Sequence, residues 1–197
     1  DCPPGEILGC DGTCQADVNG GIACPLTCGA DAPEPLVLPD GSSFQFCSEA
    51  ASWQAAQLYC TAQGGSLASI KDYETNEKVV DYISDAVGGG WSDAWIDGND
   101  FEQEGTWVSA QGKPLSFFYW GGGEPNNQGG EHCIQMRNQG YWNDFDCEDA
   151  ETYVCQLPKP SCPAGNQEDC DGVCVPTALS GDGSCDENLN CQDKDWD

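Results

Sequence analysis

Apolar and polar residues begin to alternate regularly near position 43. In Ser43-Phe44-Gln45-Phe46 every second residue is aromatic, which predicts a β-strand with one buried face. Ser52 follows at a position suited to a helix N-cap, because its side-chain oxygen can accept a hydrogen bond from a free backbone N–H of the first turn. We predict a helix from there to about Ala62, with an inner face formed by residues three and four apart: Trp53, Ala56 and Cys60.

A second helical pattern runs from about Tyr73 to Val87. Val80, Ile83 and Val87 recur at steps of three and four residues and are predicted to face the core. We expect both helices to form scaffold rather than to carry chemistry.

The two ends of the chain lack such periodicity and are rich in cysteine, glycine and proline. The sequence Cys2-Pro3-Pro4-Gly5 through Cys10-Asp11-Gly12-Thr13-Cys14 recurs at the same spacing as Cys162-Pro163-Ala164-Gly165 through Cys170-Asp171-Gly172-Val173-Cys174. We interpret these segments as two copies of one small disulfide-rich module around a central domain. The predicted divisions are residues 1–38 for the first module and its linker, 39–158 for the central domain, and 159–197 for an acidic Cys-rich module.

The number of cysteines, 15 in 197 residues, points to structural disulfides and to a secreted, extracellular protein. No apolar run approaches the roughly 20 residues that a transmembrane helix needs, so we expect no membrane insertion. Asp1-Cys2-Pro3 is not a signal peptide, and we expect a mature form whose leader has been removed or lies outside the sequence.

A formal net charge of −28 excludes nucleic acid and anionic membranes as favoured partners, because both would be repelled at long range. Cations are favoured instead. Most of the acidic side chains, including the tail from Gly181 to Asp197, are expected simply to keep the surface solvated.

Oxygen-bearing side chains are concentrated between Glu124 and Cys147. Such sets suit Ca²⁺, which takes about 6–8 oxygen ligands at roughly 2.3–2.6 Å. A cis bond before Pro125 would turn both flanking side chains toward one ion, and a cis X-Pro bond costs only about 0.5–1 kcal/mol. The candidate ligands are the carboxylates of Glu124, Glu131 and Asp144 and the amides of Asn126 and Asn143.

These residues resemble the calcium and sugar site of mannose-type C-type lectins. The resemblance rests on Glu124-Pro125-Asn126, on Glu131 two residues before Cys133, and on Trp142-Asn143-Asp144 before Cys147. It covers roughly residues 39–157 and implies an α+β C-type lectin-like fold: two helices, small antiparallel sheets and a long calcium-binding loop, here with disulfide-rich terminal segments. It also implies two disulfides, Cys60 with Cys155 and Cys133 with Cys147.

One strand departs from the family pattern. Trp95-Ile96-Asp97-Gly98 stands where the family usually has Trp-Ile-Gly-Leu, which leaves the local packing open. Cys47 also lies outside the usual family positions, and we expect it to tie the first module to the central domain. The aromatic residues before the calcium loop, Trp107 and residues 117–120, are interpreted as core rather than as sugar platforms.

The resemblance implies a ligand for the calcium site. Glu124, Asn126, Glu131, Asn143 and Asp144 would hold Ca²⁺, and two neighbouring hydroxyls of a carbohydrate would complete its shell. The order Glu-Pro-Asn resembles sites for mannose, fucose, glucose or N-acetylglucosamine, whereas galactose-type sites read Gln-Pro-Asp. The alternative from the same motif is a calcium loop that stabilises the fold without sugar affinity.

A second, auxiliary calcium site is indicated by Asp100, Glu104 and Asn127, which would share Glu131 with the first. His132 stands where the family usually has aspartate, and imidazole is a poorer calcium ligand than carboxylate. His132 is also the only histidine, but no nucleophile pattern accompanies it. The acidic residues that could suggest a glycosidase would be occupied by metal, so we predict no enzyme activity.

Two further expectations concern the whole protein. A homo-oligomer is expected, because several shallow sugar sites on one assembly gain avidity. The alternative of another class is a structural or surface-binding protein on the same fold, one that recognises ice or calcium mineral.

Overall fold

The structure is a computed structural model that describes residues 28–29 and 32–159. It also gives the backbone of four short strands: β1 (Glu6–Leu8), β2 (Cys14–Ala16), β10 (Asn166–Glu168) and β11 (Cys174–Pro176). The chain divides into two compact units, one of Asp1–Leu36 with Phe44–Leu157 and one of Val37–Ser43 with Pro158–Asp197. All predicted calcium ligands belong to the first unit.

The first helix forms where the sequence predicts it. Helix α1 spans Trp53–Ala62, and the Oγ of Ser52 accepts a 3.4 Å hydrogen bond from the backbone N–H of Ala55. Its buried face contains Trp53, Ala56 and Cys60, which confirms the predicted inner face, together with Ala55.

The second helix is also present, and its predicted inner face is confirmed at Ile83 but not at Val80 or Val87. Helix α2 spans Tyr73–Ala86 and buries Asn76, Val79 and Ile83. Val87 is 36% exposed because it lies after the last turn, as the C-cap residue. The buried face of α2 includes a polar residue, Asn76, which a search for apolar residues at helical spacing does not include. That search therefore selected Val80, and the buried valine is Val79.

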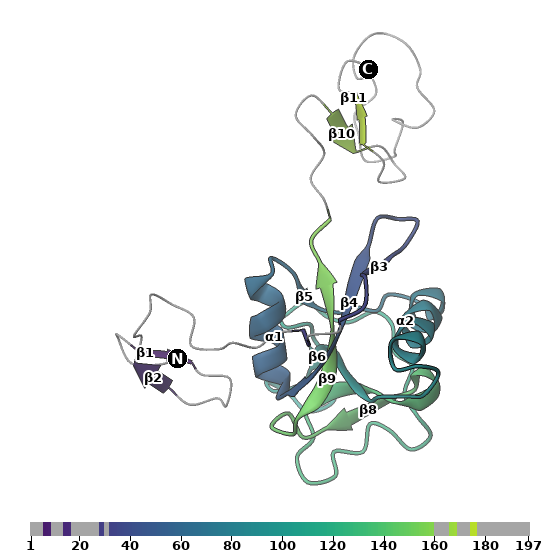
Figure 1. The fold of residues 1–197 in the computed structure, drawn as a ribbon. Coiled ribbons are helices and arrows are strands. Elements are labelled where there is room, and N and C mark those ends of the chain that lie inside the picture. The colour runs from purple at the N-terminus through teal and green to yellow at the C-terminus, as the bar shows by residue number, and fades with distance from the viewer. Residues whose placement is uncertain are drawn as a thin grey trace, which may run out of the picture. The chain divides into compact units, whose positions relative to one another are not determined.

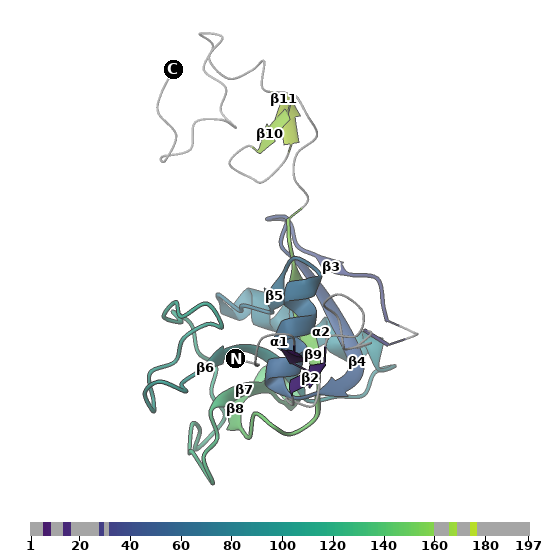
Figure 2. The same ribbon diagram turned by 90° about the vertical axis from the view of Figure 1, so that its left-hand side faces the viewer.

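The strands form one mixed sheet, in the order β3-β4-β9-β6-β7-β8, with β5 paired to β9 (Figure 1). The predicted α+β fold with two helices is confirmed, and because β6 runs parallel to β9 this central sheet is mixed rather than purely antiparallel. In both views the helices flank these strands (Figures 1 and 2). The strand bounds are β3 (Leu36–Val37), β4 (Ser43–Ala51), β5 (Ser66–Leu67), β6 (Ala94–Asn99), β7 (Cys133–Met136), β8 (Trp142–Phe145) and β9 (Glu151–Leu157).

Strand β6 accommodates its unusual Asp97-Gly98 pair inside the core. The Asp97 carboxylate accepts a 2.8 Å hydrogen bond from the backbone N–H of Ala110. Gly98 has a φ of +146°, and a Cβ there would lie 2.4 Å from Cδ1 of Ile134. Glycine is therefore required at position 98, because the side chain of the neighbouring strand occupies that space.

Three disulfides stabilise the described part of the chain. Cys60 bonds to Cys155 and Cys133 bonds to Cys147, the two pairs that the resemblance implied. Cys28 bonds to Cys47, which confirms that Cys47 ties the N-terminal Cys-rich segment to the central domain. The other predicted features of the terminal cysteines lie outside the described residues.

The repeated terminal segments each contain one antiparallel strand pair. Strands β1 and β2 pair Leu8 with Cys14, and β10 and β11 pair Glu168 with Cys174, which are equivalent positions of the repeat. The rest of both segments lies outside the described residues, so their interpretation as two copies of one module stays a prediction. Neither helix in the described part has the length and apolar character needed to cross a bilayer.

Candidate calcium and sugar site

The site is assembled from a long loop segment and the strand that follows it. Residues 100–132, between β6 and β7, run beside strands β6, β7 and β8 (Figure 2). Within this segment the Glu124–Pro125 peptide bond is cis. Strand β8 carries Asn143 and Asp144, and its pairing with β7 places Asn143 opposite Gln135.

Four of the five predicted ligands are joined by hydrogen bonds. The side-chain amide of Asn126 donates to the carboxylate of Glu124. The buried carboxylate of Asp144 accepts from the backbone N–H groups of Asn126 and Asn127, at 3.0 and 2.6 Å. These bonds tie the loop to strand β8 and bring Glu124, Asn126 and Asp144 into one cluster.

The backbone N–H of Gln128 connects the fourth ligand to this cluster. It lies 2.7 Å from Oδ1 of Asn126 and 3.0 Å from Oε2 of Glu131. One donor thus holds an amide oxygen and a carboxylate oxygen close to each other. Oxygen atoms gathered in this way are suitable ligands for a hard cation.

The fifth ligand, Asn143, is buried in strand β8. Its Nδ2 lies 3.5 Å from Oε1 of Gln135 on the paired strand. Gln135 was not predicted as a site residue. It follows Cys133 by two positions on β7, so strand alternation places it on the same side as that cysteine, but only the β7–β8 register brings it to Asn143.

The electrostatics of the cluster favour a bound cation. The pKa of Glu131 is raised, first by burial and then by the negative charges of Asp144, Glu124 and Asp146, while the Gln128 N–H acts in the opposite direction. Within the described residues no lysine or arginine forms an ion pair with these carboxylates. The donor set, oxygen atoms with uncompensated negative charge, therefore fits Ca²⁺ better than it fits soft metals.

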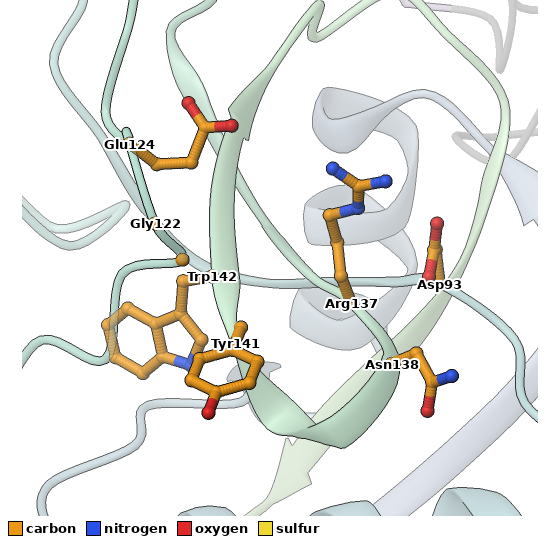
Figure 3. Close-up of a pocket in the computed structure, with 8 residues that line it drawn as sticks. Asp93, Gly122, Glu124, Arg137, Asn138, Tyr141 and Trp142 are labelled. Atoms are coloured by element: carbon orange, nitrogen blue, oxygen red, sulfur yellow. The ribbon is translucent and has the colours of Figure 1, made fainter.

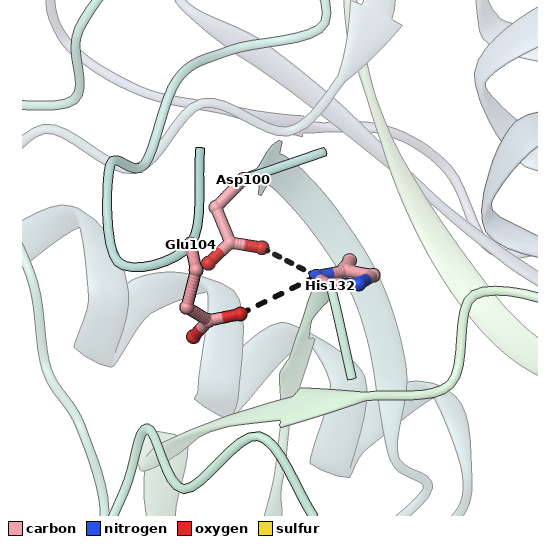
Figure 4. Close-up of side chains that lie close together, drawn as sticks. All are labelled: Asp100, Glu104 and His132. Atoms are coloured by element: carbon pink, nitrogen blue, oxygen red, sulfur yellow. Dashed lines mark hydrogen bonds and ion pairs between the residues drawn. The ribbon is translucent and has the colours of Figure 1, made fainter. Parts of the chain in front are cut away.

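The auxiliary residues Asp100 and Glu104 form a second group together with His132 (Figure 4). Nδ1 of His132 lies 2.9 Å from Oδ1 of the buried Asp100 and 3.7 Å from Oε2 of Glu104. The side chain of Asn127 donates to Glu104 at 2.5 Å, and its Oδ1 accepts from the Glu131 N–H at 3.0 Å. Ligand atoms of the two acids and the histidine lie within 4.8 Å of one another, so this group can hold a metal ion.

A pocket of about 400 Å³ adjoins the primary cluster at Glu124 (Figure 3). It is formed where the loop, the start of β6 and the turn before β8 meet. Sequence reasoning missed most of its wall, because these residues come from separate parts of the chain. The lining residues are Asp93, Gly121, Gly122, Glu124, Arg137, Asn138, Tyr141 and Trp142.

Comparison with known proteins decides the family. Residues 49–157, more than half of the chain, match the family model described as Lectin C-type domain. The chain belongs to the C-type lectin family. Membership in this family indicates a carbohydrate-binding domain, and such domains generally bind Ca²⁺.

Individual C-type lectins resemble the same central region. Collectin-10 of Gallus gallus is 35% identical over 122 residues, which are 61% of this chain and 43% of that protein. This chain thus spans less than half the length of that relative. The mouse scavenger receptor C-type lectin carbohydrate-recognition domain superposes with a TM-score of 0.60 at 26% identity, covering 71% of this chain and 100% of that one.

Two further solved structures bear on ligand class. The carbohydrate-recognition domain of cow CD23, solved in the presence of a GlcNAc2Man3 oligosaccharide, has a TM-score of 0.57 and 28% identity and covers 66% of this chain and 97% of that one. A Ca²⁺-dependent type II antifreeze protein in its Ca²⁺-free form has a TM-score of 0.54 and 26% identity, and the match covers 66% of this chain and 100% of that one.

Proposed function

We propose that this C-type lectin binds sugars of the mannose type through Ca²⁺, without catalysis. The ion would be held by Glu124, Asn126, Glu131, Asn143 and Asp144. The observation that carries the proposal is the hydrogen-bonded cluster of oxygen ligands on Glu124, Asn126, Glu131 and Asp144. No lysine or arginine among the described residues forms an ion pair with it.

The sugar would bind by two neighbouring hydroxyls that replace water on the ion. A hydroxyl in this position needs one acceptor and one donor beside the metal. The Glu124 carboxylate and the Asn126 amide supply that pair, and they are hydrogen-bonded to each other in this structure. Since the acceptor comes first and the donor second, the site supports mannose, fucose, glucose or N-acetylglucosamine over galactose. The structure of cow CD23 was solved in the presence of an oligosaccharide of mannose and N-acetylglucosamine, which is consistent with this choice.

A glycan array with the full chain, run in calcium and again in chelator, tests the proposal. We expect signal on mannose-type or fucose-type glycans, and we expect chelator to abolish it. Calcium binding by calorimetry without any glycan signal would instead support a calcium loop that only stabilises the fold. The two outcomes can be distinguished because the array measures glycan binding and calorimetry measures calcium binding.

A second candidate function is the recognition of an extended surface such as ice or calcium mineral. The similarity to a Ca²⁺-dependent antifreeze protein and the net charge of −28 favour it. Inhibition of ice growth or crystal growth, together with an empty glycan array, would support this candidate over the lectin.

The setting that suits this function is extracellular and multivalent. We propose secretion, in keeping with the three disulfides of the described region. We also propose a homo-oligomer, because several linked sites raise avidity by about 10²–10⁴ over one site. Light scattering of the full chain would give its mass in solution, and a monomer at all concentrations would contradict the second proposal.

A further inference from the structure

We infer that the pocket beside Glu124 extends the sugar site and takes an acidic substituent of the bound sugar, a carboxylate, sulfate or phosphate. The group that would bind it is the guanidinium of Arg137. The inference rests on the proposed sugar binding at Glu124, and it adds a preference among sugars that the calcium ligands alone do not determine.

The pocket and the primary site share a wall. Glu124 is both a predicted calcium ligand and a pocket-lining residue, and Trp142, which also lines the pocket, directly precedes the ligands Asn143 and Asp144 on β8. A mannose-type sugar would bind the ion through its neighbouring hydroxyls on carbons 3 and 4, and in one of the two orientations of that diol its exocyclic carbon, one ring position further on, would point toward this pocket. A substituent on that carbon can enter it.

Arg137 is the only arginine of the sequence, and its guanidinium is unused. It is exposed, and within the described residues its side chain forms no hydrogen bond or ion pair. Figure 3 shows its side chain drawn between those of Glu124 and Asp93. Of the six basic residues in the chain, Arg137 is the one that lines this pocket. Guanidinium binds carboxylate, sulfate and phosphate through two parallel hydrogen bonds.

The two carboxylates in the same pocket are engaged elsewhere. Asp93 accepts a 2.6 Å hydrogen bond from Nε1 of Trp91. Glu124 would have its charge neutralised by the calcium ion. With the ion bound, Arg137 and Asp93 are the charged side chains of this pocket outside the calcium site, and the Arg137 guanidinium is the one that can pair with an anion. At physiological salt the screening length is about 8 Å, so more distant carboxylates contribute little.

The backbone around Arg137 is held in place before any ligand arrives. The N–H of Arg137 donates to the carbonyl of Tyr141 at 2.7 Å, and the N–H of Gly140 donates to the carbonyl of Arg137 at 2.8 Å. Tyr141 is 42% exposed and stacks on Tyr119, with ring centroids 5.0 Å apart. The pocket thus combines an aromatic wall with one cationic side chain, a composition that suits a small-molecule subsite.

Binding of three matched sugar pairs by the full chain tests the inference: N-acetylglucosamine and its 6-sulfate, mannose and its 6-phosphate, glucose and glucuronic acid. Calorimetry in calcium at about 0.15 M salt compares the wild type with Arg137→Gln, Arg137→Lys and the control Lys113→Gln. Lys113 is exposed, does not line the pocket, and loses the same charge in its variant.

We expect at least one acidic sugar to bind the wild type about threefold to tenfold more tightly than its neutral partner. Arg137→Gln should remove this preference and leave the affinity for the neutral sugar unchanged. Arg137→Lys should keep part of the preference for the acidic sugar, and Lys113→Gln should keep all of it. The inference is overturned if the wild type shows no preference in any sugar pair, or if the preference survives Arg137→Gln. It is also overturned if Arg137→Gln lowers the affinity for the acidic and the neutral sugar of a pair equally. Absence of all calcium-dependent sugar binding by the wild type would overturn the proposed function itself.

Discussion

The indole Nε1 of Trp142 donates a 2.9 Å hydrogen bond to Oδ1 of Asn76, a residue 66 positions earlier in the sequence. The same Asn76 side chain donates through Nδ2 to the carbonyl of Gly140 at 3.2 Å. One buried amide on helix α2 therefore fixes the strand that carries Asn143 and Asp144 and also the turn that precedes it.

Replacing Asn76 with alanine should loosen the calcium site from a distance. The change leaves the buried Nε1 of Trp142 and the carbonyl of Gly140 without partners, which should lower the free energy of unfolding by about 2–3 kcal/mol. We also expect weaker calcium binding, since β8 loses its anchor. Denaturant unfolding and calcium calorimetry measure the two effects. Glu77→Ala, at an exposed position of the same helix, is the control and should change neither.

Asp144→Asn should weaken calcium binding by about 10–100-fold or more, because it removes a buried carboxylate from the ligand set. An amide at this position can still accept a hydrogen bond from one backbone N–H, so the loop should keep its conformation. Calorimetry measures the affinity. The matched control is Asp146→Asn, which loses the same charge at an exposed position. If both variants lowered the calcium affinity equally, the loss of one negative charge would explain the effect, and Asp144 would not be a calcium ligand.

His132→Asp should strengthen the auxiliary site. The substitution replaces an imidazole that contacts Asp100 with a carboxylate, which is a better calcium ligand. The affinity for the second calcium ion should therefore rise by roughly tenfold or more. Calcium stoichiometry and affinity from calorimetry check this expectation. His132→Ala removes the imidazole without adding an oxygen and should give a smaller gain. Unchanged stoichiometry and affinity in His132→Asp would contradict our account of this position.

Asp97 should make stability depend on pH. Burial raises the pKa of this carboxyl from 3.8 to about 6, against the opposing effect of the N–H groups of Ala110 and Gly98. The folded state therefore holds the proton more tightly than the unfolded state. The stabilisation is complete below about pH 4 and is lost as the pH rises through about 6, a change of roughly 2–4 kcal/mol.

Asp97→Asn should flatten this dependence. Its amide oxygen can still accept from the Ala110 N–H, and it cannot ionise. Urea unfolding from pH 4 to pH 7 in chelator, which removes the contribution of calcium, compares the variant with the wild type. Asp81→Asn, at an exposed position on α2, should leave the wild-type slope intact. A variant slope equal to that of the wild type would show that Asp97 does not titrate in this range.

Much of the candidate site was visible in the sequence because it depends on residue type and short spacing. Glu124, Asn126 and Glu131 lie in one loop, and Asn143 with Asp144 lie in one short strand, so their chemistry could be recognised before their positions were known. Ser52 and the apolar steps after it likewise predicted helix α1, since capping and helical periodicity are local properties.

The tertiary structure alone decided how distant segments meet. It placed Asn76 under Trp142, where an apolar pattern had pointed to Val80 and Val87, and it brought Arg137 to the same pocket as Glu124. It also made β6 run parallel to β9, which no local signal indicates. Side-chain chemistry and periodicity are encoded along the chain, whereas a contact between distant residues depends on the register and packing of whole elements, and these exist only once the chain has folded.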